Sequence, residues 1–303
     1  MPDTGEMSCL LCGVSAPAEV LSEALRDDRS GRHKVRRCSV CGHIQLFPLP
    51  DEEADKAYYD ADRQARSLIP DFDFELWRQK CREDTERRLQ WLGRVRPAPA
   101  RVLDIGSGYG FFVDAAVGAG YEAVGSDLST ERVALANANL RGEFVCGLVD
   151  DRFVEVQRGR FDLVTLFHVL EHVPMPVEFL GRCKALLSPG GTLLIEVPNV
   201  ADALLWECAA YREFYWQRAH LSYFDAARLE LALRRAGCGD VRVEGVQRYG
   251  VRNLLNWVDA GKPQLEAAAE TVPNPVVAEL EASYRRHREQ ALRSDSLTVE
   301  VRS

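Results

Sequence analysis

Beyond Pro99 the chain alternates short apolar runs with stretches of helical periodicity, and this alternation restricts the possible folds more than any other feature. Apolar runs separated by helices predict parallel strands, because parallel neighbours need a long crossover connection. The pattern therefore predicts an α/β fold with a doubly wound parallel sheet and right-handed crossovers. Strands are expected at 101–105, 122–126, 144–146, 161–167, 192–197, 241–246 and 296–301, and helices from Phe111, from Thr130, up to Leu187 and over 226–236.

The first of these strands runs into a glycine-rich turn. An apolar run that includes Asp104 is followed by Gly106-Ser107-Gly108-Tyr109-Gly110 and then by a helix, which predicts a ligand at the carboxyl end of the strand. The GxGxG spacing departs from the GxGxxG dinucleotide fingerprint and lacks the GK[ST] ending of a phosphate loop. Nicotinamide and nucleoside triphosphate ligands are thereby disfavoured. The acidic Asp104 beside the turn suits a ligand with a cation, such as a sulfonium or an ammonium.

Two CxxC pairs lie near the start of the chain, Cys9 with Cys12 and Cys38 with Cys41. Four thiolates at this spacing are typical of a zinc ribbon, and a glycine follows each pair at the equivalent position, as such turns prefer. Two unrelated cysteine pairs are the alternative. A closed site of four thiolates has no open coordination position, so the predicted zinc is structural and catalysis is expected elsewhere.

Composition narrows the possible partners and compartment. The formal net charge of −8 argues against a protein that grips long nucleic acids through their phosphates. The one basic run, 32–37, lies between the cysteine pairs and is expected to be a solvated strand of the ribbon rather than an RNA contact. No apolar run approaches the ~20 residues of a membrane helix, and the N-terminus lacks a signal pattern. A cytoplasmic protein is expected.

The remaining cysteines are scattered singly along the chain, which suits a reducing compartment better than a disulfide framework. We expect them to be packing residues. They are Cys81, Cys146, Cys183, Cys208 and Cys238.

The turn over 102–110 and the acid Asp127 at the end of the second strand resemble the class I S-adenosylmethionine-dependent methyltransferases. The resemblance implies a Rossmann-like fold in which the glycine turn approaches the amino-acid end of the cofactor and Asp127 binds the ribose hydroxyls. Adenine is expected after the third strand, with Asp150 or Asp151 near its amine. The cofactor residues implied are Asp104, Gly106, Ser107, Gly108, Asp127, Leu128, Gly147, Leu148, Phe167 and His168.

The fourth strand ends in His168-Val169-Leu170-Glu171-His172, which by its letters is the HxxEH pattern of a zinc peptidase. A peptidase needs this pattern inside a continuous helix, whereas here it follows a buried strand and precedes Pro174 and Pro176. The segment instead resembles the strand-four region of ubiquinone-pathway and sugar-modifying methyltransferases. Similar groupings bind magnesium in small-RNA ribose methyltransferases, so magnesium is a less favoured alternative here.

Three histidines are candidate bases. His168 and His172 follow the fourth strand, and His220 lies in a histidine-leucine-aromatic segment that resembles the same methyltransferase group. With Glu171 they form the predicted catalytic set. Hydrogen-bonded histidines in the wall of the site are the equal alternative for each one singly.

Aromatic residues are dense around His220, and we expect this segment to line the acceptor pocket. For any single aromatic residue, packing in the core is the favoured interpretation. Tyr58 and Tyr59 are expected to close over the cofactor, with packing as the equal alternative. The aromatic set is Trp206, Tyr211, Phe214, Tyr215, Trp216, Tyr223 and Phe224.

Four segments are predicted: a zinc ribbon at 1–50, a helical connector at 51–100, a cofactor-binding core at 101–249, and a helical insertion with a final strand at 250–303. The insertion is expected to act as a lid or a homodimer contact. The resemblance implies methyl transfer to an oxygen of a small or carrier-linked metabolite, with a sugar nucleotide or glycosylated natural product favoured. The alternatives are carbon methylation, and an RNA or protein methyltransferase that uses the ribbon for recognition.

Overall fold

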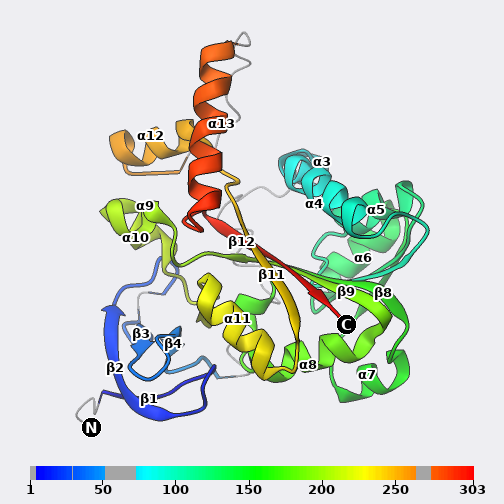
Figure 1. The fold of residues 1–303 in the computed structure, drawn as a ribbon, viewed down its shortest axis with the longest axis horizontal. Helices are drawn as coiled ribbons and strands as arrows, with labels where there is room; N and C mark the ends of the chain where they lie inside the picture. The colour runs from blue at the N-terminus through cyan, green and yellow to red at the C-terminus, as the bar shows by residue number, and fades with distance from the viewer. Residues whose placement is uncertain (1–4, 29, 52–72, 264–273) are drawn as a thin grey trace.

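The structure is a computed structural model that describes residues 5–28, 30–51, 73–263 and 274–303 (Figure 1). Tyr58 and Tyr59 lie outside the described residues. Among the helices that are described, none combines the length and the apolar character needed to cross a membrane. Two sheets organise the molecule.

The larger sheet has seven strands in the order β11-β12-β9-β8-β5-β6-β7. The strands from β5 to β9 are parallel, but β12 pairs antiparallel with both β9 and β11. The predicted parallel order of the core strands is confirmed, and the sheet as a whole is mixed because β12 returns from a helical excursion and runs antiparallel to its neighbours. The bounds are β5 Arg101–Ile105, β6 Glu122–Asp127, β7 Glu143–Cys146, β8 Phe161–Phe167, β9 Leu187–Pro198, β11 Asp240–Val246 and β12 Ser296–Arg302.

Helices cover both faces of this sheet, because successive apolar side chains of each strand point to opposite faces and both sets are buried. Val102 packs with side chains of α4, α5 and α6 on one face, whereas its neighbour Leu103 packs with those of α7, α8 and α11 on the other. Figure 1 shows the two helical layers on either side of the strands. The bounds are α4 Arg82–Val95, α5 Phe111–Gly118, α6 Thr130–Asn139, α7 Asp151–Gln157, α8 Pro176–Leu186 and α11 Ala226–Arg235.

The smaller sheet contains the N-terminal strands β1 Glu6–Ser8, β2 Ser15–Ser22, β3 Lys34–Cys38 and β4 Ile44–Phe47. Its fifth strand, β10 Ser222–Tyr223, belongs to a segment more than 170 residues further along the chain and pairs antiparallel with β4. The N-terminal unit is thus joined to the core by a shared sheet. The sequence pattern did not predict this pairing, because β10 is too short to show the alternation of apolar and polar residues that marks a strand.

The remaining helices extend from the carboxyl end of the sheet. The excursion between the last two strands contains α12 Val251–Ala260 and α13 Pro275–Gln290, as the sequence predicted, and α13 projects away from the sheet at the top of Figure 1. Trp257 of α12 packs its ring 5.1 Å from Tyr211 and 5.1 Å from Phe214. The other helices are α3 Phe74–Lys80, α9 Ala203–Glu207 and α10 Ala209–Tyr215.

Candidate active site

The glycine turn lies where the sequence places it, between β5 and α5. Gly106 and Gly108 have φ values of +70° and +57°, which side chains rarely tolerate. A Cβ on Gly106 would lie 2.4 Å from Cγ2 of Val169, so the turn directly contacts the loop after β8. The predicted cofactor turn and the predicted catalytic loop are therefore neighbours.

Asp127 ties the carboxyl ends of adjacent strands together. Its Oδ2 accepts a hydrogen bond from the Gly108 amide at 2.8 Å, and its Oδ1 accepts one from the Ser129 amide at 2.9 Å. The Gly147 amide in turn donates to the Asp127 carbonyl at 3.1 Å. The three segments that the resemblance assigns to the cofactor thus converge at one edge of the sheet.

Two apolar side chains at this edge are exposed. Leu128 is 51% exposed and Leu148 is 66% exposed. Such side chains suit a flat apolar ligand, which is the role expected of them beside adenine. Asp150 caps α7 by accepting from the Phe153 amide at 2.8 Å, and Asp151 pairs with Arg182 at 2.7 Å, so both acids already have protein partners.

Asp104 and Phe167 are buried beneath the turn. The Thr165 hydroxyl donates to Asp104 Oδ1 at 2.6 Å, and burial raises the pKa of this carboxyl to about 7. A cationic ligand group nearby would stabilise the ionised form. The Phe167 ring packs between Trp91 and Phe112, so it belongs to the core.

His168 has a strained backbone, with a φ of +58° that costs about 1–3 kcal/mol in a residue other than glycine. Its Nδ1 lies 3.3 Å from Oε1 of Glu171, and its Nε2 lies 3.2 Å from Oε1 of Glu196. Burial lowers the pKa of His168, but the hydrogen bonds to these two carboxylates outweigh burial and raise it above its ordinary value. The Arg248 guanidinium also lies 3.1 Å from Nε2 and can only donate, yet the two carboxylates favour the protonated ring.

Glu196, at the end of β9, anchors an ionic network. Arg87 contacts its Oε1 at 2.8 Å, and Arg88 contacts its Oε2 at 2.9 Å. Burial alone would raise the pKa of Glu196, but Arg88, His168 and Arg87 together hold it well below its ordinary value. Arg248 lies 3.8 Å from the same carboxylate and also pairs with Asp84.

This network was not predicted from the sequence. A charged residue at the end of an otherwise apolar strand was the available signal for Glu196. The arginines gave no signal, because Arg87 and Arg88 lie in a helix rich in other charges and Arg248 stands alone in a short loop.

Glu171, His172 and His220 form a second group, which we call the histidine cluster; their ligand atoms lie within 4.8 Å of one another. The Glu171 side chain is buried, and its nearest charged neighbour is Nδ1 of His168, 3.3 Å from Oε1. Burial would raise the pKa of Glu171, but His168, His172 and His220 lower it to about 2. Two imidazoles and a carboxylate are a poor donor set for magnesium, which prefers oxygen ligands.

The tautomer of His172 follows from its contacts. Its Nδ1 lies 2.7 Å from the Ala219 carbonyl, which can only accept, so Nδ1 carries the proton and Nε2 carries the lone pair in the neutral ring. Nε2 lies 3.9 Å from Oε1 of Glu171. The His172 and His220 rings meet edge to face at 5.0 Å. The structure thus brings together all four predicted catalytic residues, since His168 contacts Glu171 on its other side.

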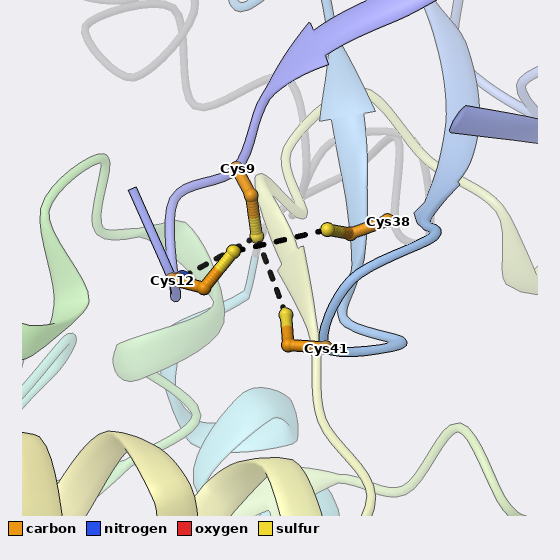
Figure 2. A group of neighbouring side chains, drawn as sticks. All are labelled: Cys9, Cys12, Cys38 and Cys41. Carbon is orange, nitrogen blue, oxygen red and sulfur yellow. Dashed lines mark hydrogen bonds between the residues drawn. The ribbon is translucent and has the colours of Figure 1, made fainter. Parts of the chain in front are cut away.

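The four cysteines of the CxxC pairs also converge, and we call them the cysteine cluster (Figure 2). The Sγ atoms of Cys9 and Cys41 are 3.6 Å apart, and those of Cys12 and Cys38 are 3.8 Å apart. A tetrahedral zinc with bonds of about 2.3 Å would separate its sulfurs by about 3.8 Å, so the donor set and its spacing fit this ion.

The turns around the cysteine cluster have the expected geometry. Gly13 and Gly42 have φ values of +73° and +75°, and the Cys12 amide lies 3.5 Å from Cys9 Sγ. Among the other cysteines, Cys183 and Cys238 are buried, as expected of packing residues. Cys146 is exposed, which corrects that expectation, because the end of the edge strand β7 leaves its side chain uncovered.

Comparison with known proteins agrees with this geometry. Residues 74–243 match the family model described as "Methyltransferase domain". A ubiquinone biosynthesis O-methyltransferase of Xanthomonas axonopodis is 36% identical over 122 residues, which cover 38% of this chain and 51% of the relative. Its counterpart in Burkholderia ambifaria is 32% identical over 117 residues. The chain spans about half the length of the curated relatives it matches.

Solved structures share the fold. A SAM-dependent methyltransferase of Archaeoglobus fulgidus aligns with a TM-score of 0.52 at 19% identity and covers 76% of this chain and 100% of its own. Phosphoethanolamine N-methyltransferase 2 of Haemonchus contortus, solved with S-adenosyl-L-methionine, aligns with a TM-score of 0.50 at 22% identity and covers 72% of this chain and 52% of its own. The chain belongs to the methyltransferase-domain family.

Proposed function

We propose that this enzyme transfers a methyl group from S-adenosylmethionine to a hydroxyl oxygen of a small or carrier-linked molecule. The observation that carries the proposal is the histidine cluster, which lies beside the loop that contacts the glycine turn. A base next to the cofactor is what a hydroxyl acceptor needs. The relatives named as O-methyltransferases support an oxygen acceptor.

The cofactor would supply the electrophilic methyl group, and the chain would hold it through residues of three strand ends. Asp104 and the glycine turn suit its amino-acid end, Asp127 suits the ribose hydroxyls, and the exposed Leu148 suits adenine. Methyl transfer is an in-line displacement whose main demand is to place the acceptor about 3 Å from the methyl carbon. Positioning is therefore expected to contribute more than proton removal.

His172 is the base that we favour. Because its Nδ1 donates to the Ala219 carbonyl, its Nε2 can take a proton from the acceptor hydroxyl. The buried carboxylate of Glu171 would stabilise the resulting imidazolium. His168, held between two carboxylates, is assigned to positioning the loop, since a protonated ring is a poor base.

Two acceptor classes follow from different observations. The resemblance of the strand-four and His220 segments to sugar-modifying enzymes favours a sugar nucleotide or a glycosylated natural product. The names of the curated relatives favour a phenolic hydroxyl, such as that of a ubiquinone precursor. Carbon methylation needs the same base beside a carbonyl and is the remaining alternative.

Incubation with methyl-labelled S-adenosylmethionine and a panel of sugar nucleotides and catechols tests the proposal. Mass spectrometry identifies the methylated acceptor, and the carbon chemical shift of the labelled methyl distinguishes an O-methyl from a C-methyl product. We expect an O-methyl product from one class. A C-methyl product, or transfer to RNA or protein in place of every small acceptor, would contradict the proposal.

The cysteine cluster is proposed to hold a structural zinc ion. Its support is the fit of four converging thiols to tetrahedral spacing, with both glycine turns in place. A metal analysis of the purified protein should give one zinc per chain.

A further inference from the structure

The N-terminal unit contacts the core segment 214–223 near both of its ends, and His220 lies between the two contacts. At one end, the Arg26 amide donates to the Trp216 carbonyl at 2.9 Å, and Asp27 Oδ1 accepts from the Arg218 amide at 2.7 Å. The Arg26 guanidinium lies 4.1 Å above the centre of the Phe214 ring. The ribbon loop is therefore docked through backbone and side chain together.

At the other end, the contact is the pairing of β10 with β4 in the shared sheet. Ser222 pairs with Gln45, and the Leu46 amide donates to the Leu221 carbonyl at 3.0 Å. The Tyr223 hydroxyl reaches back to the backbone of Gln217, accepting from its amide at 3.1 Å and donating to its carbonyl at 3.0 Å. Both ends of the ribbon contact thus converge on Gln217.

The side chain of Gln217 links Arg26 to His220. Arg26 donates to Gln217 Oε1 at 2.6 Å, and the Gln217 amide nitrogen lies 2.9 Å from Nε2 of His220. Because a guanidinium can only donate, the amide oxygen must face Arg26 and the NH₂ group must face His220. Gln217 and His220 are both buried, so water does not compete for these bonds.

This orientation determines the state of His220. A ring nitrogen that accepts from Gln217 carries a lone pair, and in a neutral ring the proton then lies on the other nitrogen. The 2.9 Å contact is the better bond, since the contact of 3.3 Å to Nδ1 is at the long limit for N–H donors. His220 is accordingly held as a neutral hydrogen-bond donor beside Glu171 and His172.

We propose that Arg26 of the ribbon is a positioning residue for methyl transfer, which acts through Gln217 to hold His220 in one tautomer and one orientation. The inference rests on the proposed function, because it assigns His220 to the acceptor site. It gives the ribbon a part in the reaction: the ribbon supplies a side chain that orders the site, in addition to any role of the cysteine cluster in folding.

Three variants separate this role from general stability. Arg26→Ala removes the donor, Arg26→Lys keeps a cationic donor, and Gln217→Glu keeps the shape and the pairing with Arg26 but cannot donate to His220. Arg32→Ala is the matched control, since Arg32 is a ribbon arginine whose exposed pair with Asp51 spans 3.8 Å. If Arg26→Ala fails to fold, Gln217→Glu carries the test.

The first readout is independent of turnover. Nitrogen NMR of histidine-labelled protein reports which ring nitrogen of His220 is protonated, with the signal assigned through His220→Gln. Wild type and Arg32→Ala should show one tautomer, whereas Gln217→Glu should show the ring protonated at Nε2. Unchanged His220 signals in both Arg26→Ala and Gln217→Glu would overturn the inference.

The second readout is kinetic. A lost buried hydrogen bond predicts a fall in kcat of about tenfold for Arg26→Ala, partial recovery in Arg26→Lys, and a change below about twofold in the KM for S-adenosylmethionine. Gln217→Glu should shift the acidic limb of the kcat pH profile upward, because a carboxylate partner favours the imidazolium. A normal kcat with a normal pH profile in both variants would refute the role. Altered His220 signals in a protein that methylates RNA or protein in place of every small acceptor would instead refute the proposed function and leave the linkage standing.

Discussion

The cysteine cluster and the histidine cluster both bring ligand-type side chains within a few ångströms, but they are built in different ways. The cysteines come from two tight turns and their sulfurs converge on one point, at spacings that suit a closed tetrahedral ion. The histidine cluster combines a buried carboxylate, contacted by His168 at 3.3 Å, with rings held by an amide and a carbonyl. The first arrangement suits a structural role, whereas the second places a candidate base beside a carboxylate, which suits proton transfer.

The largest effect is expected from a substitution that disrupts the cysteine cluster. Cys38→Ser removes one thiolate, and because metal binding contributes on the order of 10 kcal/mol to folding in isolated zinc modules, we expect loss of zinc and unfolding of the ribbon. Turnover should collapse with it, since β4 pairs with β10 next to His220. Metal analysis and thermal melting measure the outcome.

The control for this variant is Cys146→Ser, at an exposed cysteine outside both clusters, which should keep its zinc and its Tm. A Cys38→Ser protein without zinc but with normal melting and activity would show that the cysteine cluster does not support the fold.

The next largest effect is expected from substitutions in the histidine cluster. His172→Ala should lower kcat by about 10²–10⁴-fold, the usual contribution of a general base, while the affinity for S-adenosylmethionine stays nearly unchanged. His220→Ala and His168→Ala should also lower turnover, by less, because both residues act on position. Steady-state kinetics and calorimetry separate the two quantities. The exposed His287→Ala is the matched control; normal turnover in all three site variants would remove the base assignment.

A smaller effect is the pH dependence that arises from ionisation of Asp104. Burial raises the pKa of Asp104 from 3.8 to about 7, so the ligand-free protein is more stable when this carboxyl is protonated and loses that stability as pH rises from about 4 through 7. A cationic cofactor favours the ionised form, so affinity should fall by up to about tenfold for each pH unit below 7. Calorimetry between pH 6 and 8 should show proton release on binding.

Asp104→Asn should make the cofactor affinity independent of pH over this range. A wild-type affinity that is already flat between pH 6 and 8 would mean that Asp104 does not face the cation.

The smallest effect concerns acid stability. The pKa of Glu171 falls from 4.5 to about 2 in the folded protein, so its contribution is present above about 4.5 and is lost as pH falls through 2. Glu171→Gln should reduce the slope of unfolding free energy against pH between 5 and 2, as measured by chemical denaturation. Glu178→Gln, at an exposed acid on α8, should leave that slope unchanged.

Much of the core could be predicted because its signals are local. The strands 101–105 and 161–167 are bounded as predicted, since apolar runs between turn residues mark their own ends. The contact between Gly106 and the strand-four loop follows from parallel strands that end at one edge of the sheet. The HxxEH letters were correctly separated from a peptidase helix, since a short 3₁₀ turn at Leu170–His172 precedes the helix that starts at Pro176.

The site was less predictable where partners come from distant segments. His220 could be named as a candidate, but its contact with His172 depends on a loop that is pinned by the ribbon. The arginines around Glu196 come from α4 and from the loop after β11, and no local pattern links them.

The sequence by itself determined the α/β core, the glycine turn, the acid after the second strand and the two cysteine pairs, because each depends on periodicity or spacing within a few residues. Only the tertiary structure decided that β12 runs antiparallel, that β10 joins the N-terminal sheet, and that Arg26 reaches His220 through Gln217. These contacts join residues up to about 190 positions apart. Their partners are chosen by packing and hydrogen-bond satisfaction in the folded chain, which leave no periodic trace in the sequence.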